Sequence, residues 1–531
     1  MTETAVGDGG MVVAPHSAAA LAGAEILKAG GSAVDAMIAA AAAIAVVYPH
    51  MNHLGGDGFW LIAEPGDRPP RFIDASGRAG ARATPAFYRD QEHDTIPRRG
   101  PLAALTAAGA VAGWDLAHRF AASIGGGLPL GDLLAPAIGF ARDGIRVTRS
   151  QTALTREKFD ELAGCPGFAA TFLTDGKAPE TGSRLAFPRL ADTLDHLART
   201  GLGDFYRGDV GAEIAADLER IGSPVTRADL ERTVAEFRAP LSTRLSVGTV
   251  YNAPPPTQGL ASLVILGLFD RLKVARAEGF EHVHGLVEAT KRAFLLRDRV
   301  VTCPDRLPAD PQSFLSGPWL DREVEKIDRR RAAPWPAPPS GGDTIWMGAI
   351  DRNGVAVSYI QSIFFEFGSG CVLPATGVLW QNRGASFSLD PKALNVLKPG
   401  AKPFHTLNPA LARLDDGRLM VYGTMGGEGQ PQTQAAVFTR HVLFREDLWK
   451  AIDAPRWLLG RTWGDETTAL RLENRFDPGV IDRLDSAGHP VIVLDAGWSD
   501  TMGHAGAITR RADGRMEGAH DPRADGGAAL A

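Results

Sequence analysis

A run of prolines and glycines divides this chain into two parts with different patterns. The run is RRRAAPWPAPPSGGD, residues 329–343, and its four prolines and two glycines exclude a regular helix or strand there. The part before it is mostly helical in pattern. The part after it has short apolar segments between turn residues, which is typical of β-strands. We therefore expect an α+β fold with a helical and mixed first part and a β-rich last part.

The first part opens with two predicted helices and a glycine-rich turn. Residues 17–30 predict a helix that stops at a Gly-Gly pair, and residues 33–47 predict a second helix that ends before a proline. HLGGDGFWLIAEPG, residues 53–66, predicts a tight turn that leads into a strand. The second helix is short for a bilayer and carries Asp35, so we expect it to be buried rather than to span a membrane.

The last part begins with a predicted hairpin. Two strands within residues 344–362 flank a turn that contains an Asn-Gly pair, which is a strong hairpin signal. Further strands are predicted at residues 377–383 and 418–429 and near the C-terminus.

Composition argues against several classes of partner and site. The net charge is -6, so nothing favours nucleic acid or an anionic membrane as a partner. The three cysteines lie far apart, and His282 and His284 are too close in sequence to share a helix face, so we expect no metal and no cofactor. The N-terminal segment MTETAVGDGG has no basic or apolar region of a secretory signal, and we therefore expect a cytoplasmic protein.

Thr344 stands where the irregular run meets the first predicted strand of the last part. A threonine hydroxyl is a poor nucleophile by itself, but an N-terminal threonine can use its own α-amino group, with a pKa of about 8, as the base. That amine exists only if the Asp343–Thr344 peptide bond is cut. From the local sequence alone, an ordinary residue that begins a strand is the favoured interpretation, because Gly-Asp-Thr is not a specific motif.

GTMGGEG, residues 423–429, ends a predicted strand with several glycines. Such a turn lets backbone N–H groups approach a substrate, as an oxyanion hole requires, although a loose turn is the commoner explanation. No Gly-Lys-Ser/Thr follows, so it is not a phosphate-binding loop. Polar residues beside the predicted strands could line a pocket, namely Ser362, Gln381, Asn382, Arg383, His405 and Thr406.

Taken together and in order, several segments resemble the γ-glutamyltransferase family of N-terminal nucleophile hydrolases. They include GAEILKAGGSAVDAMIAAAAAIAVVYPHMNHLGGDGFW, DTIWMGAIDRNGVAVSYIQS, KPFHTLNPAL and GTMGGEGQPQ, and they cover nearly the whole chain. The resemblance implies a four-layer αββα sandwich formed by both halves of a precursor that cleaves itself. Cleavage between Asp343 and Thr344 would give a large subunit, residues 1–343, and a small subunit, residues 344–531.

The resemblance also implies roles for particular residues. Thr344 falls on the family's nucleophile, which overturns the local interpretation of this residue. Ser362 falls on a hydroxyl residue that hydrogen-bonds the amine of the nucleophile. Gly426 and Gly427 fall on the pair whose backbone amides hold the oxyanion.

The residues that clamp a γ-glutamyl group in the family are absent from this sequence. By spacing, Ser76 stands in place of an arginine that binds the substrate carboxylate, and Ser386 stands in place of an acid that binds its ammonium group. His405 and Thr406 replace a pair of serines. A γ-glutamyl group would therefore bury charges without partners, which costs several kcal/mol.

LWQNRG, FSLDP, PFHTLNPAL and MGGEGQPQ resemble a divergent branch of the family that includes oxamate amidohydrolase and glutathione-hydrolase-like proteins. This resemblance favours a small carboxylated amide as the substrate, with Arg383 as the carboxylate partner and Arg78 as a second candidate. The expected enzyme is an amidohydrolase or acyltransferase, whose acyl group passes to water or to an amine. A glutathione hydrolase or γ-glutamyltransferase and a binding scaffold without catalysis remain the alternatives. The expected partners are the small-molecule amide and the two subunits of one precursor, with a homodimer of these heterodimers as an option.

Overall fold

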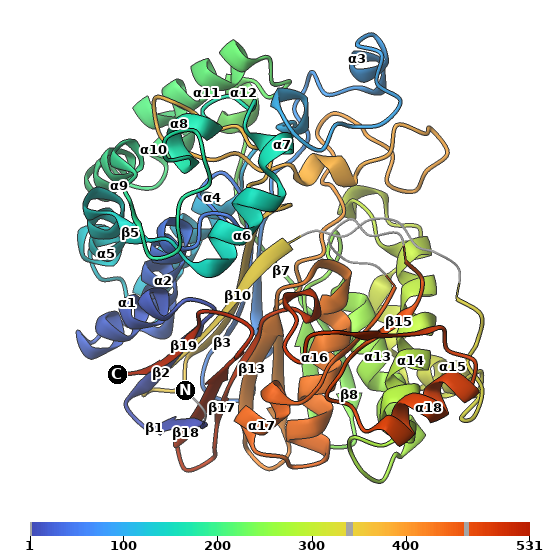
Figure 1. The fold of residues 1–531 in the computed structure, drawn as a ribbon. Helices are drawn as coiled ribbons and strands as arrows, with labels where there is room; N and C mark the ends of the chain where they lie inside the picture. The colour runs from blue at the N-terminus through green and yellow to red at the C-terminus, as the bar shows by residue number, and fades with distance from the viewer. Residues whose placement is uncertain (1–2, 336–342, 461–466) are drawn as a thin grey trace.

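The computed structural model describes residues 3–335, 343–460 and 467–531. Two seven-stranded sheets pack face to face in the middle of the molecule, and helices cover the outer face of each sheet (Figure 1). The order of layers is therefore α, β, β and α, and the sandwich expected from the sequence is confirmed.

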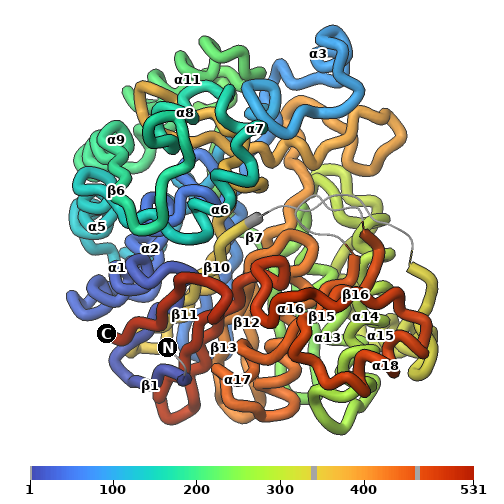
Figure 2. The backbone as a smooth tube through the Cα atoms, viewed as in Figure 1, coloured from blue at the N-terminus to red at the C-terminus, as the bar shows by residue number. Residues whose placement is uncertain are grey.

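Strands from both sides of residue 343 are interleaved in each sheet (Figure 2). The sheet that we call the β10 sheet consists, in spatial order, of β19 (Gly527–Leu530), β2 (Gly10–Ala14), β10 (Asp343–Asp351), β11 (Ala356–Phe364), β3 (Asp57–Ala63), β4 (Arg71–Ala75) and β7 (Glu236–Arg238). The other, which we call the β13 sheet, consists of β1 (Ala5–Gly7), β18 (Met516–His520), β17 (Ala505–Arg510), β13 (Leu419–Thr424), β12 (Ala410–Leu414), β9 (Gly248–Asn252) and β8 (Leu241–Leu245). Neighbouring strands within both sheets are antiparallel.

Alternating side chains of the strands supply separate apolar layers, because successive residues of a strand point to opposite faces. In β3, Phe59 and Leu61 belong to the layer between the two sheets, whereas Trp60 and Ile62 pack against the helices. The strands are buried on both faces, which explains why the apolar run in this segment is continuous.

The helices form two outer layers. Those on the side of the β10 sheet are α1 (Ser17–Lys28), α2 (Ala33–Val47), α4 (Ala110–Ser123), α5 (Leu130–Asp143), α6 (Arg149–Glu157), α7 (Phe159–Leu162), α8 (Phe168–Phe172), α9 (Pro188–Thr200), α10 (Asp204–Arg207), α11 (Asp209–Ile221) and α12 (Arg227–Glu231). Those on the side of the β13 sheet are α13 (Gly259–Leu272), α14 (Phe280–Val300), α15 (Gly317–Val324), α16 (Gln430–Phe438), α17 (Leu448–Asp453) and α18 (Pro478–Ser486). The remaining elements are the short helix α3 (Pro85–Arg89), the pair β5 (Ile145–Arg146) and β6 (Arg184–Leu185), and a small sheet of β14 (Trp457–Leu459), β15 (Leu470–Glu473) and β16 (Val491–Leu494).

The two predicted N-terminal helices are confirmed as α1 and α2. Asp35 lies in the first turn of α2, where its carboxylate accepts hydrogen bonds from the backbone N–H and hydroxyl of Ser32 and from the N–H of Gly127. These bonds explain how an acid can be buried in an apolar helix. Among the described residues, no helix has the length and apolar character needed to cross a bilayer.

The predicted hairpin is confirmed as β10 and β11, but the strand predicted at residues 377–383 is wrong. That segment makes only isolated bridges and ends in a short 3-10 helix, η4 (Arg383–Ser386). The amide side chains of Gln381 and Asn382 bond to backbone groups of distant segments, which fixes an irregular path without a ladder. Of the Pro/Gly run, residues 329–335 form no helix or strand, as expected, and residues 336–342 lie outside the described residues.

Candidate active site

Thr344 lies near the start of β10, between the two sheets. Its side chain is fully buried, and Trp346, two residues further along the strand, belongs to the layer between the sheets. The register of β10 against β11 shifts at Thr344, between the pairs Asp343–Phe364 and Ile345–Gln361. Such an irregularity re-aims a side chain. The Thr344 Oγ1 atom is buried and has no hydrogen-bond partner among the described residues.

Ser362 lies on β11 at the same irregularity. Its hydroxyl accepts a hydrogen bond from the backbone N–H of Phe364 at 2.8 Å, which fixes the side chain at the end of the strand. Ser362 is also the register partner of Asp57, the first residue of β3. The ends of β10, β11 and β3 therefore bring Thr344, Ser362 and Asp57 to one end of the β10 sheet.

The glycine pair follows β13, on the facing sheet. Gly426 and Gly427 have φ angles of +115° and +53°, which lie in the region that favours glycine. They lead into the short 3-10 helix η5 (Gly427–Gly429) and then α16. A turn of this kind before a helix N-terminus presents successive backbone N–H groups, which is the arrangement that binds a developing anion.

A buried polar network holds this turn in place. The Gln258 side chain donates hydrogen bonds to the carbonyl oxygens of Thr406 and Gly427, each at 2.8 Å. Arg297 in turn donates to the Gln258 side-chain oxygen at 3.0 Å and pairs with the carboxylate of Glu428 at 3.2 Å. The loop before β12 and the turn after β13 are therefore joined to each other, which fixes the backbone around the glycine pair.

Arg383 is a buried cation in η4. Its Nη1 atom donates to the hydroxyl of Thr406 at 3.3 Å, and its guanidinium lies 4.0 Å from the ring centre of Phe364. Its Nη2 atom is buried and has no hydrogen-bond partner within the part of the chain that the structure describes. Burial lowers the Arg383 pKa to about 9, and the nearby Asp57 opposes this shift, so the guanidinium stays charged near pH 7. A buried cation with a free donor is suited to bind an anion.

Asp57 is the residue that the sequence analysis missed. One carboxylate oxygen accepts hydrogen bonds from the backbone N–H groups of Gly77 and Gly109, at 2.8 Å and 2.9 Å. The other oxygen lies 3.4 Å from Nε2 of His405 and makes no hydrogen bond to any described residue. Burial raises the Asp57 pKa to about 6. The available signal was an acid among glycines directly before an apolar strand, which we interpreted only as a turn.

His405 faces the same space from the loop before β12. Its ring lies 5.0 Å from that of Phe59, edge to face, and neither ring nitrogen has a hydrogen-bond partner among residues 3–335, 343–460 and 467–531. Burial and the neighbouring Arg383 lower its pKa well below the usual range, so the ring is neutral. The site therefore gathers several unsatisfied buried polar atoms, and these are groups that a polar ligand or water must satisfy.

Four other predicted site residues are engaged elsewhere. Asn382 bonds to the backbone of Phe365 and Arg98, and Ser386 donates to the carbonyl oxygen of Phe404 at 3.0 Å. Ser76 and Arg78 line a separate pocket of about 190 Å³.

In that pocket, the Ser76 hydroxyl donates to Asp74 at 2.6 Å. Arg78 is half-exposed and pairs with Asp305 at 2.8 Å. The structure thus brings Arg383, and not Arg78, together with the Thr344 region.

A cavity of about 820 Å³ lies beside the site. Its lining includes Phe365, which follows Phe364, and Glu428, which follows the glycine pair. It also includes Arg98, Ser386 and Phe404, so a mixed apolar and polar surface leads from the outside toward the ends of β11 and β13.

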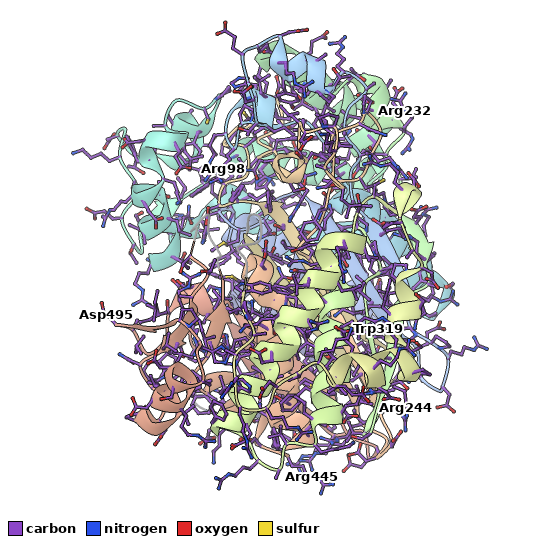
Figure 3. All side chains as sticks on the ribbon, turned by 90° about the vertical axis from the view of Figure 1, so that its right-hand side faces the viewer. Arg98, Arg232, Arg244, Trp319, Arg445 and Asp495 are labelled. Carbon is purple, nitrogen blue, oxygen red and sulfur yellow. The ribbon has the colours of Figure 1, made fainter. Side chains whose placement is uncertain are left out.

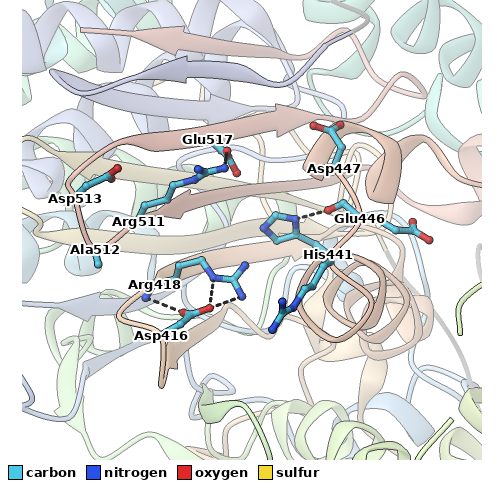
Figure 4. A pocket seen from close by; sticks show the side chains of 10 residues that line it. Asp416, Arg418, His441, Glu446, Asp447, Arg511, Ala512, Asp513 and Glu517 are labelled. Carbon is cyan, nitrogen blue, oxygen red and sulfur yellow. Dashed lines mark hydrogen bonds and ion pairs between the residues drawn. The ribbon is translucent and has the colours of Figure 1, made fainter. Parts of the chain in front are cut away.

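A second cavity, of about 720 Å³, lies at the other end of the β13 sheet. Charged residues line it, and Asp416 and Arg418 pair with each other in the turn before β13 (Figure 4). Arg445 of this cavity lies at the bottom of the view in Figure 3, whereas Arg98, beside the first cavity, lies in its upper half. The second cavity is therefore separate from the Thr344 region.

His284, Glu288 and His489 form a buried group of residue types that can bind a metal. The two rings already bond to each other, with 2.8 Å between Nδ1 of His284 and Nε2 of His489. The Lys291 ammonium lies 2.7 Å from the Glu288 carboxylate and adds a positive charge at the same place. A backbone N–H, that of Ala333, also donates to Glu288. These partners give the group a structural use, which is to hold the start of the Pro/Gly run against α14.

Comparisons with known proteins show what the chain is similar to. A sequence model described as Gamma-glutamyltranspeptidase matches residues 19–531. Oxamate amidohydrolase proenzyme of Klebsiella pneumoniae is 55% identical, over 98% of both chains. The Glutathione hydrolase-like YwrD proenzyme of Bacillus subtilis is 40% identical, over 99% of both chains. Cephalosporin acylase from Bacillus halodurans has a similar structure, with a TM-score of 0.90 and 30% identity, covering 100% of this chain and 97% of that one.

Proposed function

This chain belongs to the gamma-glutamyltranspeptidase family, and from that premise we propose that it is a self-processing amidohydrolase whose substrate is a small amide with one carboxylate, such as oxamate. The observation that carries the proposal is the buried Arg383 guanidinium. It packs on Phe364, the register partner of the residue before Thr344, and it keeps one donor free. An anionic group on the substrate would satisfy that donor.

Processing comes first and takes place at the Asp343–Thr344 bond. The Thr344 hydroxyl oxygen attacks the Asp343 carbonyl carbon, and the peptide C–N bond breaks as the nitrogen takes up the hydroxyl proton. Water then hydrolyses the resulting ester. The products are a carboxylate on Asp343 and a free hydroxyl and α-amino group on Thr344. Residues 1–343 and 344–531 become the large and the small subunit.

Turnover uses the same hydroxyl. The α-amino group of Thr344 takes the hydroxyl proton as the oxygen bonds to the amide carbonyl carbon, and the N–H groups of Gly426 and Gly427 stabilise the oxyanion. The C–N bond then breaks, and the proton passes to the leaving nitrogen. Water hydrolyses the acyl ester, so that oxamate gives oxalate and ammonia. Ser362 orients the α-amino group.

The surroundings of Arg383 favour this substrate class over γ-glutamyl compounds. A γ-glutamyl group carries an ammonium in addition to a carboxylate, and Ser386, at the position of the expected acid, is bonded to the Phe404 carbonyl. Ser76, at the position of the expected arginine, is bonded to Asp74. Glutathione hydrolysis remains the second candidate, because several relatives carry that name.

The test is a comparison of substrates on the processed protein. Release of ammonia from oxamate is measured beside release of product from glutathione and from γ-glutamyl-p-nitroanilide. We expect kcat/KM for oxamate to exceed that for the γ-glutamyl compounds by roughly 10²-fold or more, since each unpaired buried charge costs several kcal/mol. Efficient γ-glutamyl turnover with little oxamate turnover would reverse the choice between the two candidates. A homodimer of heterodimers and a cytoplasmic location stay predictions.

A further inference from the structure

Two opposite charges share one buried site at the ends of β10, β11 and β3. Arg383 and Asp57 are both buried, and each has one polar atom without a hydrogen-bond partner in the described part of the chain. The proposed reaction gives Arg383 a role but leaves Asp57 without one. A buried carboxylate is costly unless its oxygens are hydrogen-bonded or paired, and one oxygen of Asp57 has no hydrogen-bond partner among the described residues.

The two charges are connected to different strands of the β10 sheet. β10, β11 and β3 are consecutive neighbours in the sheet, separated by about 4.8 Å per strand. Thr344 is on β10, Arg383 packs on the ring of Phe364 from β11, and Asp57 is on β3. Arg383 thus contacts a residue of the strand next to that of Thr344, and Asp57 is on the strand after it. A substrate that extends across the sheet from Thr344 is therefore expected to reach Arg383 before Asp57.

We propose that Asp57 is a specificity-determining residue, which limits the substrate to amides whose carboxylate lies close to the scissile carbonyl. This inference rests on the proposed function. A short monoamide places its carboxylate at Arg383. A longer one carries its carboxylate past Arg383 toward the free oxygen of Asp57, where like charges repel in a buried environment.

The groups around Asp57 leave this repulsion largely uncompensated. Gly77 and Gly109 donate to one of its oxygens only, and the nearby Gln381 amide, which also lowers the Asp57 pKa, carries no charge. The neutral ring of His405 lies against the other oxygen and has at most one N–H to offer. Arg383 is the cation that acts on Asp57, and it would already be paired with a bound carboxylate. A second anion at Asp57 would therefore lack a counter-charge.

The repulsion is expected to depend on pH. The titratable groups that face Asp57 are Arg383, His405, Tyr206 and Tyr359. Burial raises the pKa of both tyrosines and lowers that of His405, so all three stay neutral near pH 7, and Arg383 stays charged. Asp57 has a pKa raised to about 6, so its charge is present above that pH and disappears below it. Discrimination against long substrates should weaken as the pH falls through 6.

The test uses a series of monoamides in which successive methylene groups separate the amide from the carboxylate, namely oxamate, malonamate, succinamate and glutaramate. The variant is Asp57→Asn, which keeps an acceptor oxygen for Gly77 and Gly109 and removes only the charge. We expect the ratio of kcat/KM for succinamate to that for oxamate to rise on the order of ten- to hundred-fold. The matched control is Asp35→Asn, another buried acid with backbone partners, at the opposite end of β10; this ratio should stay unchanged.

A second measurement, on the wild-type protein, does not depend on whether the variant folds and is processed. In the wild-type protein, the same ratio should be higher at pH 5.5 than at pH 7.5, and in Asp57→Asn this pH dependence should be absent. If oxamate is hydrolysed but the ratio is insensitive to both the substitution and pH, the role of Asp57 is overturned while the proposed function stands. If the processed protein hydrolyses none of the monoamides, both are overturned.

Discussion

Replacement of Arg383 by Gln tests the proposed carboxylate site most directly. The guanidinium is buried, lies on Phe364 and has one free donor, so we expect it to meet a substrate carboxylate away from water. Removing one partner of a buried ion pair costs on the order of 3–5 kcal/mol. Since about 1.4 kcal/mol corresponds to a factor of ten, kcat/KM for oxamate should fall by roughly 10²- to 10³-fold.

The assay is the initial rate of ammonia release from oxamate, with processing followed on a denaturing gel. If Arg383→Gln is cleaved normally but shows the expected loss in kcat/KM, the substitution affects substrate binding and not processing. In this variant the pKa of Asp57 would rise further, because the cation that lowers it is gone. The control is Arg78→Gln, because Arg78 is half-exposed and pairs with Asp305; its effect should stay within about two-fold. If Arg383→Gln is cleaved and keeps near wild-type turnover of oxamate, the carboxylate is bound elsewhere and the reasoning fails.

Three further predictions concern processing, the oxyanion and stability. Thr344→Ala should remain at full length and inactive, because one hydroxyl serves both reactions; two bands on a denaturing gel would contradict this. Gly427→Val, at a φ of +53°, should lower kcat by about 10²-fold or more in any protein that is cleaved, and an unchanged kcat would exclude Gly427 from the oxyanion site. Asp521 pairs with Arg456 and Arg523, which hold its pKa near 2, so it stabilises the fold above its unfolded pKa of about 3.9 and ceases to do so as the pH falls toward 2. In the uncleaved Thr344→Ala precursor, Asp521→Asn should therefore lower the free energy of unfolding by on the order of 3–5 kcal/mol at pH 7 in a denaturant titration, and the difference from the precursor with Asp521 should shrink in acid.

Local patterns were enough to predict the elements whose signals lie within a few residues. The helix over residues 33–47 and the hairpin that begins near Thr344 follow from caps, turn residues and periodicity. The strand predicted at residues 377–383 failed because Gln381 and Asn382 form hydrogen bonds with segments far away in the chain. No local pattern contains those partners.

The same distinction between local signals and distant partners applies to the residues of the site. Family resemblance suggested Thr344 and the glycine pair, and their roles stay predictions until they are tested. Asp57 could not be selected from the sequence, because its importance comes from burial beside His405 and Arg383, which lie more than three hundred residues later. The sequence ranked Arg383 above Arg78, and the structure separates them further, because Arg383 is buried whereas Arg78 is half-exposed and pairs with Asp305.

The interleaving of strands also determines how the cleaved protein unfolds and refolds. In the β10 sheet, β2 and β3 precede residue 343, and each pairs with a strand that follows it. A cut after residue 343 would thus leave two polypeptides that both contribute strands to the same two sheets. Separating them would require breaking hydrogen-bonded ladders in both sheets. We expect the precursor to fold as one chain, with rates independent of concentration. Recovery of the cleaved protein from denaturant would instead be a bimolecular reaction between two incomplete sheets. The nick would make unfolding practically irreversible at low concentration, so that the lifetime of the mature protein is set by its rate of unfolding rather than by an equilibrium.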